Sequence, residues 1–223
     1  MPIPDTTQSD SARPARHRVP IVVLWICGTC IAIEVVLQLA DLGLMGSALW
    51  RGLVYQNGAF WPGLLRGWQP NYAAQPVVMF LSYAFLHGGF WHLLGNVIAL
   101  LVLGRIAVEQ VGGTLTALIY AFSAFGGALV YGLMAFGANP MVGASGAIFG
   151  LAGAWQYWDF VDPRLTRRRR RNLLRSVGFL VLLNVVFWLL LDGVLAWQTH
   201  LGGFLTGWIA AAALFRWRPP RSQ

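Results

Sequence analysis

The chain of 223 residues contains no lysine, because all sixteen of its basic residues are arginine. This absence excludes a serine–lysine catalytic pair and a lysine Schiff base. Charged residues make up only 11% of the chain, whereas hydrophobic residues make up 57%. Average soluble domains are roughly one quarter charged and about half apolar. The composition therefore excludes a single soluble core and predicts a membrane protein.

Ligands for a metal ion are also scarce. Cys27 and Cys30 form one C-x-x-C inside an apolar run, and nothing else in the sequence could complete a tetrahedral zinc site with them. We interpret both as small core residues, with a redox pair as the alternative. The zinc-protease motif H-E-x-x-H is absent. We therefore expect neither a metal nor a cofactor.

Acidic residues are placed wrongly for an aspartyl protease. Such an enzyme needs two carboxyl groups that share one site, here at the middle depth of a membrane. The candidate aspartates all fall at the ends of apolar segments: Asp41, Asp159, Asp162 and Asp192. The sequence therefore excludes an aspartyl pair.

Apolar runs dominate what the sequence does contain. A run of about 20 residues crosses a hydrocarbon layer of about 30 Å at 1.5 Å per residue. We predict six membrane-spanning helices in an all-α bundle, near residues 21–40, 90–106, 114–136, 141–158, 177–191 and 199–215. The first run is too long for the apolar part of a signal peptide, the competing interpretation. Residues 19–217 then form one domain, with a disordered polar tail at 1–18 and a short tail at 218–223.

Arginines gather on alternate connections between these segments. They precede the first segment, lie between the second and third and between the fourth and fifth, and end the chain. Because cytoplasmic loops collect basic residues, we predict cytoplasmic termini and a large loop, residues 41–88, at the outer interface. The run at 167–171 is interpreted as a topology signal or a contact with membrane lipids. It lacks the interleaved aromatics that would stack bases, so we expect no nucleic-acid partner.

A glycine-rich stretch at the start of the fourth segment carries one hydroxyl group. Gly143, Gly146 and Gly150 flank Ser145, where the free N–H groups and the positive dipole end of a helix suit an oxyanion. The pattern is not the G-x-S-x-G elbow, because position 147 is alanine. Close helix packing through small residues is the alternative interpretation.

Two histidines are predicted to lie at the depth of this hydroxyl. His92, Ser145 and His200 each follow the outer entry point of their segment by a few residues, which places them within about one or two helical turns of each other. Gly203 and Gly207 share a helical face with His200, so another helix can approach it closely. The arrangement predicts that the second, fourth and sixth segments converge.

Asn96 lies one helical turn after His92 on the same face. An amide and an imidazole aimed at one point can stabilise an oxyanion, although a buried asparagine or histidine more often satisfies a backbone carbonyl. His87 falls in the preceding loop, and we interpret it as a gate or a loop contact. We predict acyl transfer with Ser145 as nucleophile and His200 as general base.

A third, acidic member of this set is the less favoured interpretation. Asp192 lies eight residues before His200, across a short connection, and could reach its ring. A cap or an interfacial salt bridge is the preferred role for a single exposed acid.

Together these motifs resemble the rhomboid family of intramembrane serine proteases over roughly residues 75–210. The similar features are His87, His92 and Asn96 as H-x4-H-x3-N, then Gly143-Ala-Ser145-Gly146, then His200-x-x-Gly203-x-x-x-Gly207, with Glu109 near the end of the second segment. The resemblance implies a dyad of Ser145 and His200, with His92 and Asn96 as oxyanion donors. It also implies water access from the outer face and cleavage of membrane-anchored substrates near a small residue.

One feature of that family is missing at its usual place. Many members carry a Trp-Arg pair about nine residues before the first histidine, where this chain has Val78 and Met79. Trp50 and Arg51 lie in the same loop, far upstream. We therefore expect the loop to be anchored differently.

The sequence thus predicts an intramembrane serine endopeptidase of a bacterial inner membrane, acting on single-pass transmembrane proteins. A catalytically inactive rhomboid-like protein that binds transmembrane clients is the first alternative, but such proteins typically lack the serine or the histidine. A small-solute transporter is the second alternative. It predicts an inverted repeat, and no repeat is visible in the sequence.

Overall fold

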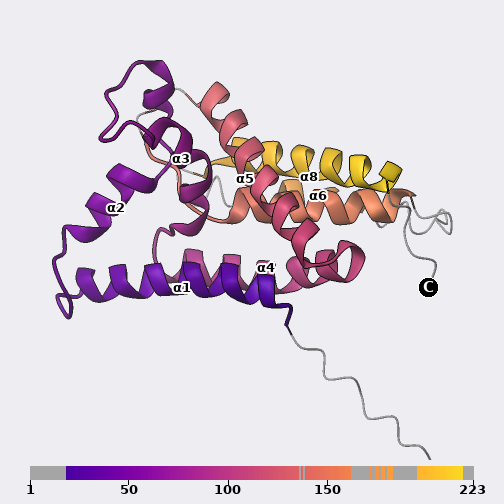
Figure 1. Cartoon of the computed structure of the whole chain (residues 1–223), viewed down its shortest axis with the longest axis horizontal. Helices are drawn as coiled ribbons and strands as arrows, with labels where there is room; N and C mark the ends of the chain where they lie inside the picture. The colour runs from indigo at the N-terminus through magenta and orange to yellow at the C-terminus, as the bar shows by residue number, and fades with distance from the viewer. Residues whose placement is uncertain are drawn as a thin grey trace, which may run out of the picture.

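The computed structural model describes residues 19–135, 137, 139–161, 171, 174–175, 177–178, 180–182 and 195–217. Helices dominate this part of the chain (Figure 1), in agreement with the predicted all-α class. In order they are α1 (Ile21–Asp41), α2 (Trp50–Gly58), the 3-10 helix η1 (Pro62–Arg66), α3 (Gln75–Ser82), the 3-10 helix η2 (Tyr83–Phe85), α4 (Phe90–Val111), α5 (Gly113–Met134), α6 (Ser145–Val161) and α8 (Trp197–Trp217).

In the part of the chain that the structure describes, three helices are long and apolar enough to cross a membrane: α1, α4 and α5. They coincide with the first three predicted segments, while α6 and α8 occupy the places of the fourth and sixth. Most of the predicted fifth segment, together with Asp192, lies outside the described residues, as do the tails at 1–18 and 218–223. The count of six spans therefore stays a prediction.

The fourth segment begins later than the sequence predicts, at Ser145 rather than Met141. Met141 exchanges two backbone hydrogen bonds with Phe60, at 2.9 and 3.0 Å. Gly143 has a φ of 125°, a value that an α-helix does not allow. An extended strip therefore leads into α6, and the hydroxyl group of interest stands at the first residue of the helix.

The second segment ends later than predicted. Helix α4 continues past Ile106 to Val111, and an ion pair between Arg105 and Glu109, 2.8 Å long, supports these last turns. Gly112 then adopts a φ of 84° and ends the helix. Glu109, which the sequence places near the helix end, is exposed and pairs within its own helix.

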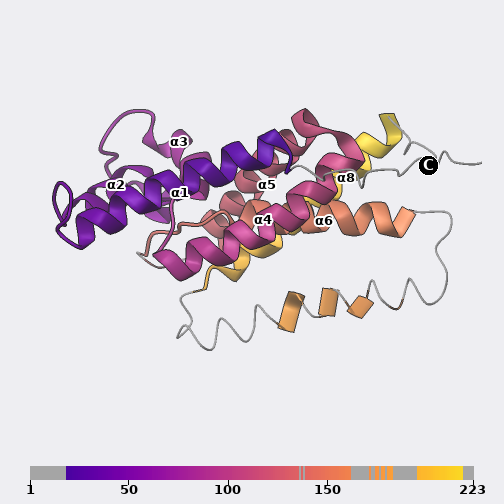
Figure 2. The same ribbon diagram turned by 90° about the horizontal axis from the view of Figure 1, so that it is seen from below.

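Helices α6 and α8 lie side by side in both views (Figures 1 and 2), and α5 packs against both of them. Helix α4 also packs against α6, and α1 packs against α4. The short helix α2 lies over the half of α1 that precedes the loop (Figure 1), and α3 packs against α2 and α5.

The backbones of α6 and α8 are in direct contact. A β-carbon on Gly203 would overlap the carbonyl oxygen of Gly146, and one on Gly207 would overlap the carbonyl oxygen of Gly150. Close packing, the alternative interpretation of these glycines, is therefore present in the structure. It brings the first turns of the two helices as near to each other as main-chain atoms allow.

The segment between α1 and α4 is tied to the bundle by buried groups. The hydroxyl group of Tyr83 donates to the carbonyl oxygen of Ala124 in α5 at 2.8 Å. The carbonyl oxygen of Tyr83 in turn accepts from the N–H of Gly143 at 3.0 Å. This segment thus holds the extended strip that leads into Ser145.

Candidate active site

The hydroxyl of α6 and the imidazole of α8 meet at the end of the helix pair. Ser145 is the first residue of α6, and His200 is the fourth residue of α8. The Ser145 Oγ lies 2.8 Å from the His200 Nε2, a hydrogen-bond distance. The His200 side chain is buried, whereas Ser145 is half-buried. A nucleophile with an adjacent base is the arrangement that serine hydrolysis requires.

Phe149 holds the plane of the histidine, a contact that the sequence analysis missed. Its ring stacks on the His200 imidazole with centroids 4.2 Å apart and an interplanar angle of 5°. Phe149 is one helical turn after Ser145 and so shares its face. That spacing was the only available signal, because an aromatic residue is ordinary in an apolar segment.

His92 approaches the same place from α4. The N–H of Gly88 donates to His92 Nδ1 at 3.2 Å. A β-carbon on Gly143 would lie 2.8 Å from both Cε1 and Nε2 of His92, and 3.8 Å from Ser145 Oγ. The Nε2 edge of the ring therefore faces the strip that carries Ser145, and Gly143 is needed there because any side chain would displace the imidazole.

Asn96 is buried one turn further along α4. Its amide nitrogen donates to the carbonyl oxygen of His92 at 2.8 Å. An amide nitrogen carries two hydrogens, so this bond leaves one N–H for another acceptor. The structure thus shows the backbone-satisfying role that is common for a buried asparagine, with a donor to spare.

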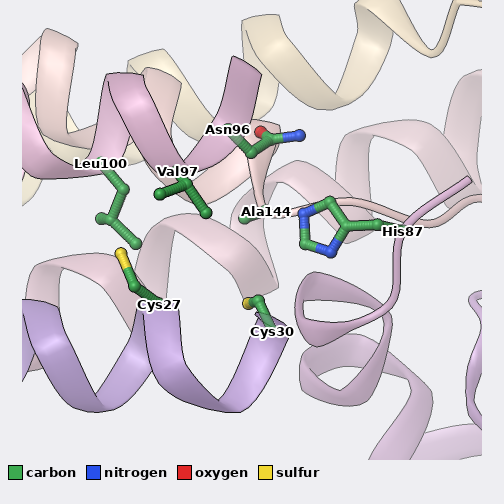
Figure 3. A pocket seen from close by; sticks show the side chains of 7 residues that line it. All are labelled: Cys27, Cys30, His87, Asn96, Val97, Leu100 and Ala144. Carbon is green, nitrogen blue, oxygen red and sulfur yellow. The ribbon is translucent and has the colours of Figure 1, made fainter. Parts of the chain in front are cut away.

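His87 is fully buried in the turn before α4. It lines a narrow space with Cys27, Cys30, Asn96, Val97, Leu100 and Ala144 (Figure 3). Neither ring nitrogen has a hydrogen-bond partner among the described residues, and the ring centroid lies 5.2 Å from that of His92. Burial, with a smaller effect of His92, lowers the pKa of His87 to about 4. Both roles predicted for it, gate and loop contact, stay predictions.

The two cysteines behave as core residues. Both are free and buried on α1, and Cys27 and Cys30 line the space beside His87 (Figure 3). Within the described ranges, no group of three histidine, cysteine or acidic side chains is arranged to hold a metal ion.

The chain is similar in sequence to known proteins. The Rhomboid domain matches residues 74–217, well over half of the chain. RHOMBOID-like protein 5 of Arabidopsis thaliana is 34% identical over 136 residues, which are 60% of this chain and 43% of that protein. Rhomboid protease GluP of Bacillus subtilis (strain 168) is 32% identical over 138 residues, 60% of this chain and 25% of the relative.

A third relative matches a longer stretch of the chain. Rhomboid-like protease 1 of Toxoplasma gondii is 33% identical over 153 residues, 67% of this chain and 49% of that protein. The chain thus spans less than half the length of each relative named here. The matched region includes every residue placed at the candidate site and all helices from α3 onward. The chain is a membrane protein that belongs to the rhomboid family.

Proposed function

We propose that this protein is an intramembrane serine endopeptidase that uses Ser145 and His200 as a catalytic dyad. The observation that carries the proposal is the 2.8 Å separation of Ser145 Oγ and His200 Nε2. The family includes relatives named as proteases, in Bacillus subtilis and Toxoplasma gondii. No cofactor is required, because a hydroxyl group, a base and oxyanion donors suffice for this chemistry.

In the first half of the reaction the Ser145 O–H donates its proton to the unprotonated Nε2 of His200. The oxygen attacks the carbonyl carbon of the scissile peptide bond, and the carbonyl oxygen becomes an oxyanion. His200 then gives the proton to the leaving nitrogen as the C–N bond breaks. The products are an ester on Ser145 and a free amine.

In the second half a water molecule replaces the amine. His200 takes a proton from the water as the water oxygen attacks the ester carbon. The tetrahedral intermediate collapses, the bond to Ser145 Oγ breaks, and the serine oxygen recovers the proton from His200. The chain thereby hydrolyses one peptide bond and returns to its starting state.

The oxyanion is held from the side of α4. His92 offers an Nε2–H, because its Nδ1 already accepts from Gly88. The Asn96 amide offers the hydrogen that its bond to the His92 carbonyl leaves over, and the N–H of Ser145 stands at the helix start. Removing one such donor typically costs about 10²–10³-fold in rate.

We propose single-pass transmembrane proteins as substrates, surrounded by the lipids of a bacterial inner membrane. The apolar helices α1, α4 and α5 support the membrane setting. The arginine distribution in the sequence supports six spans, cytoplasmic termini and a site open to the opposite side. Gly143, Gly146, Gly203 and Gly207 support the dyad by keeping the strip and the helices close, and His87 supports the loop.

A serine-directed fluorophosphonate probe tests the proposal on the full chain in detergent. We expect labelling of the wild type and none of Ser145→Ala. Incubation with a panel of single-pass substrates should give fragments whose cut sites mass spectrometry can assign. His200→Ala should slow cleavage by roughly 10²–10⁴-fold.

The matched control is Ser123→Ala. Ser123 is a fully buried serine of α5 whose hydroxyl group has no hydrogen-bond partner among the described residues, so the same change there should leave labelling intact. Labelling that persists in Ser145→Ala would contradict the nucleophile. A wild type that binds substrates without labelling or cutting them would instead indicate the client-binding alternative.

A further inference from the structure

A partly buried ion pair connects α1 to α2 near the candidate site. Arg51 of α2 binds both carboxylate oxygens of Glu34, at 2.9 and 3.1 Å. Its Nε donates to Asp41 at 2.6 Å. The Glu34 side chain is only 3% exposed and that of Arg51 only 20%. Two-pronged, charge-assisted bonds of this kind fix the orientation of a guanidinium as well as its position.

The same guanidinium reaches the turn before α4. Arg51 Nη1 donates to the carbonyl oxygen of His87 at 3.1 Å. The hydroxyl group of Tyr55, one helical turn after Arg51, donates to the same oxygen at 2.5 Å. The carbonyl of His87 is therefore held by two donors from α2, one of them charged.

This carbonyl belongs to the peptide unit that contacts His92. The C=O of His87 and the N–H of Gly88 share one planar peptide group, and in a trans peptide they point in opposite directions. The N–H of Gly88 donates to His92 Nδ1 at 3.2 Å. Fixing the carbonyl on one side thus fixes where the N–H points on the other.

We propose that Arg51, together with Tyr55, is a positioning residue that acts through the His87–Gly88 peptide to keep the proton of His92 on Nε2. A neutral imidazole carries one proton, and an N–H donor at Nδ1 makes that nitrogen the acceptor. A cation at the carbonyl end also polarises the peptide and strengthens its N–H as a donor. His92 is then ready to donate to an oxyanion.

The inference rests on the proposed function, in which His92 is an oxyanion donor. It also explains two features that the dyad leaves unused. Glu34 is a costly charge within α1, and its partner Arg51 holds the turn. Arg51 lies far from positions 78 and 79 in the sequence and reaches the histidine turn through space.

Cleavage kinetics give the first test. We expect Arg51→Gln to lower kcat by about 30-fold with little change in KM, less than the roughly 10²–10³-fold cost of losing an oxyanion donor outright. Arg51→Lys keeps a charged donor without the fork, so it should recover part of the loss. The matched control is Arg105→Gln, which breaks an exposed ion pair within α4 and should leave kcat unchanged.

The second test measures the tautomer and needs no activity. In the wild type labelled with 15N-histidine, we expect the His92 signals, assigned by their loss in His92→Asn, to show an unprotonated Nδ1 and a protonated Nε2. Tyr55→Phe, a milder change, and Arg51→Gln should both raise the Nδ1–H fraction. Wild-type tautomer fractions in both variants would overturn the proposal, even if kcat falls.

The two proposals fail in different ways. A wild type that neither labels at Ser145 nor cuts substrates would contradict the proposed function, while the tautomer measurement would still decide the role of Arg51. If Arg51→Gln does not fold, Tyr55→Phe and Arg51→Lys provide the same readouts. Equal losses in Arg51→Gln and Arg105→Gln would assign Arg51 a general structural role and overturn the inference.

Discussion

The two halves of the candidate site are built by different means. On the side of Ser145 and His200, two helices touch through their main chains, and glycines make the contact possible. On the side of His92, the turn is held by the charged and phenolic groups of Arg51, Glu34 and Tyr55. The first half should therefore be most sensitive to atoms added at the helix contact, and the second half to the loss of charged and phenolic donors.

The largest effect is expected from a substitution that breaks the helix contact. In Gly203→Ala the new β-carbon would overlap the carbonyl oxygen of Gly146, a backbone atom that cannot move aside alone. Overpacking of this kind typically costs about 1–3 kcal/mol of stability, and a displacement of about 1 Å at a catalytic pair can cost about 10²-fold in rate. Cleavage rates and thermal unfolding measure both.

Gly28→Ala is the control for that change. Gly28 also lies within a membrane helix, and a β-carbon there would meet nothing within 4 Å. We expect unchanged activity and equal or slightly higher stability, because alanine is the better helix former. Equal activity of Gly203→Ala and Gly28→Ala would show that the backbone contact does not set the dyad.

An intermediate effect concerns the turn and depends on pH. The folded protein keeps His87 neutral, with its pKa lowered to about 4 by burial, whereas the unfolded chain takes up a proton near pH 6.5. The unfolded state therefore binds more protons between these values, so stability present above pH 6.5 is lost as the pH falls towards 4. Between pH 7 and pH 5 the loss should be about 2 kcal/mol.

Thermal unfolding of His87→Gln measures this contribution. Glutamine keeps a polar group in the turn and does not titrate, so the variant should lose less stability than the wild type between pH 7 and pH 5. Parallel pH dependences of the two proteins would show that His87 is not the responsible group.

The smallest effect is expected for Phe149, a side chain on the side of Ser145 and His200. Phe149→Leu removes the ring stacked on His200, and aromatic pairs are worth about 0.5–1.5 kcal/mol. We expect kcat to fall about 2- to 10-fold while the helix contact and the fold remain. Phe149→Tyr retains the ring and should stay near the wild type, so an equal loss in both variants would argue against stacking.

The sequence predicted much of the fold because membrane helices carry a strong local signal. Apolar runs placed α1, α4 and α5 to within a few residues, and the family resemblance is confirmed by the match to the Rhomboid domain. The start of α6 was wrong because Met141 is held by Phe60, 81 residues earlier in the chain. The apolar content of a local segment does not predict a backbone partner so far away in the sequence.

The candidate site divides in the same way. Their similar depth along the predicted segments singled out Ser145, His92 and His200. The structure places Ser145 and His200 within hydrogen-bond distance. The sequence singled out Arg51 only because it follows Trp50 in the loop, and it did not predict the contacts of Arg51. Its partners Glu34 and His87 lie 17 and 36 residues away, so the network exists only once α1 and α2 have folded against each other.

The main-chain contact between α6 and α8 also limits how the site can change in evolution. Substitutions on the exposed sides of these helices leave this contact unchanged. The separation of the two helices near Ser145 and His200 cannot shrink, because their backbone atoms are already in contact. The exposed sides of α6 and α8 can therefore vary in evolution while the separation of the two helices stays the same.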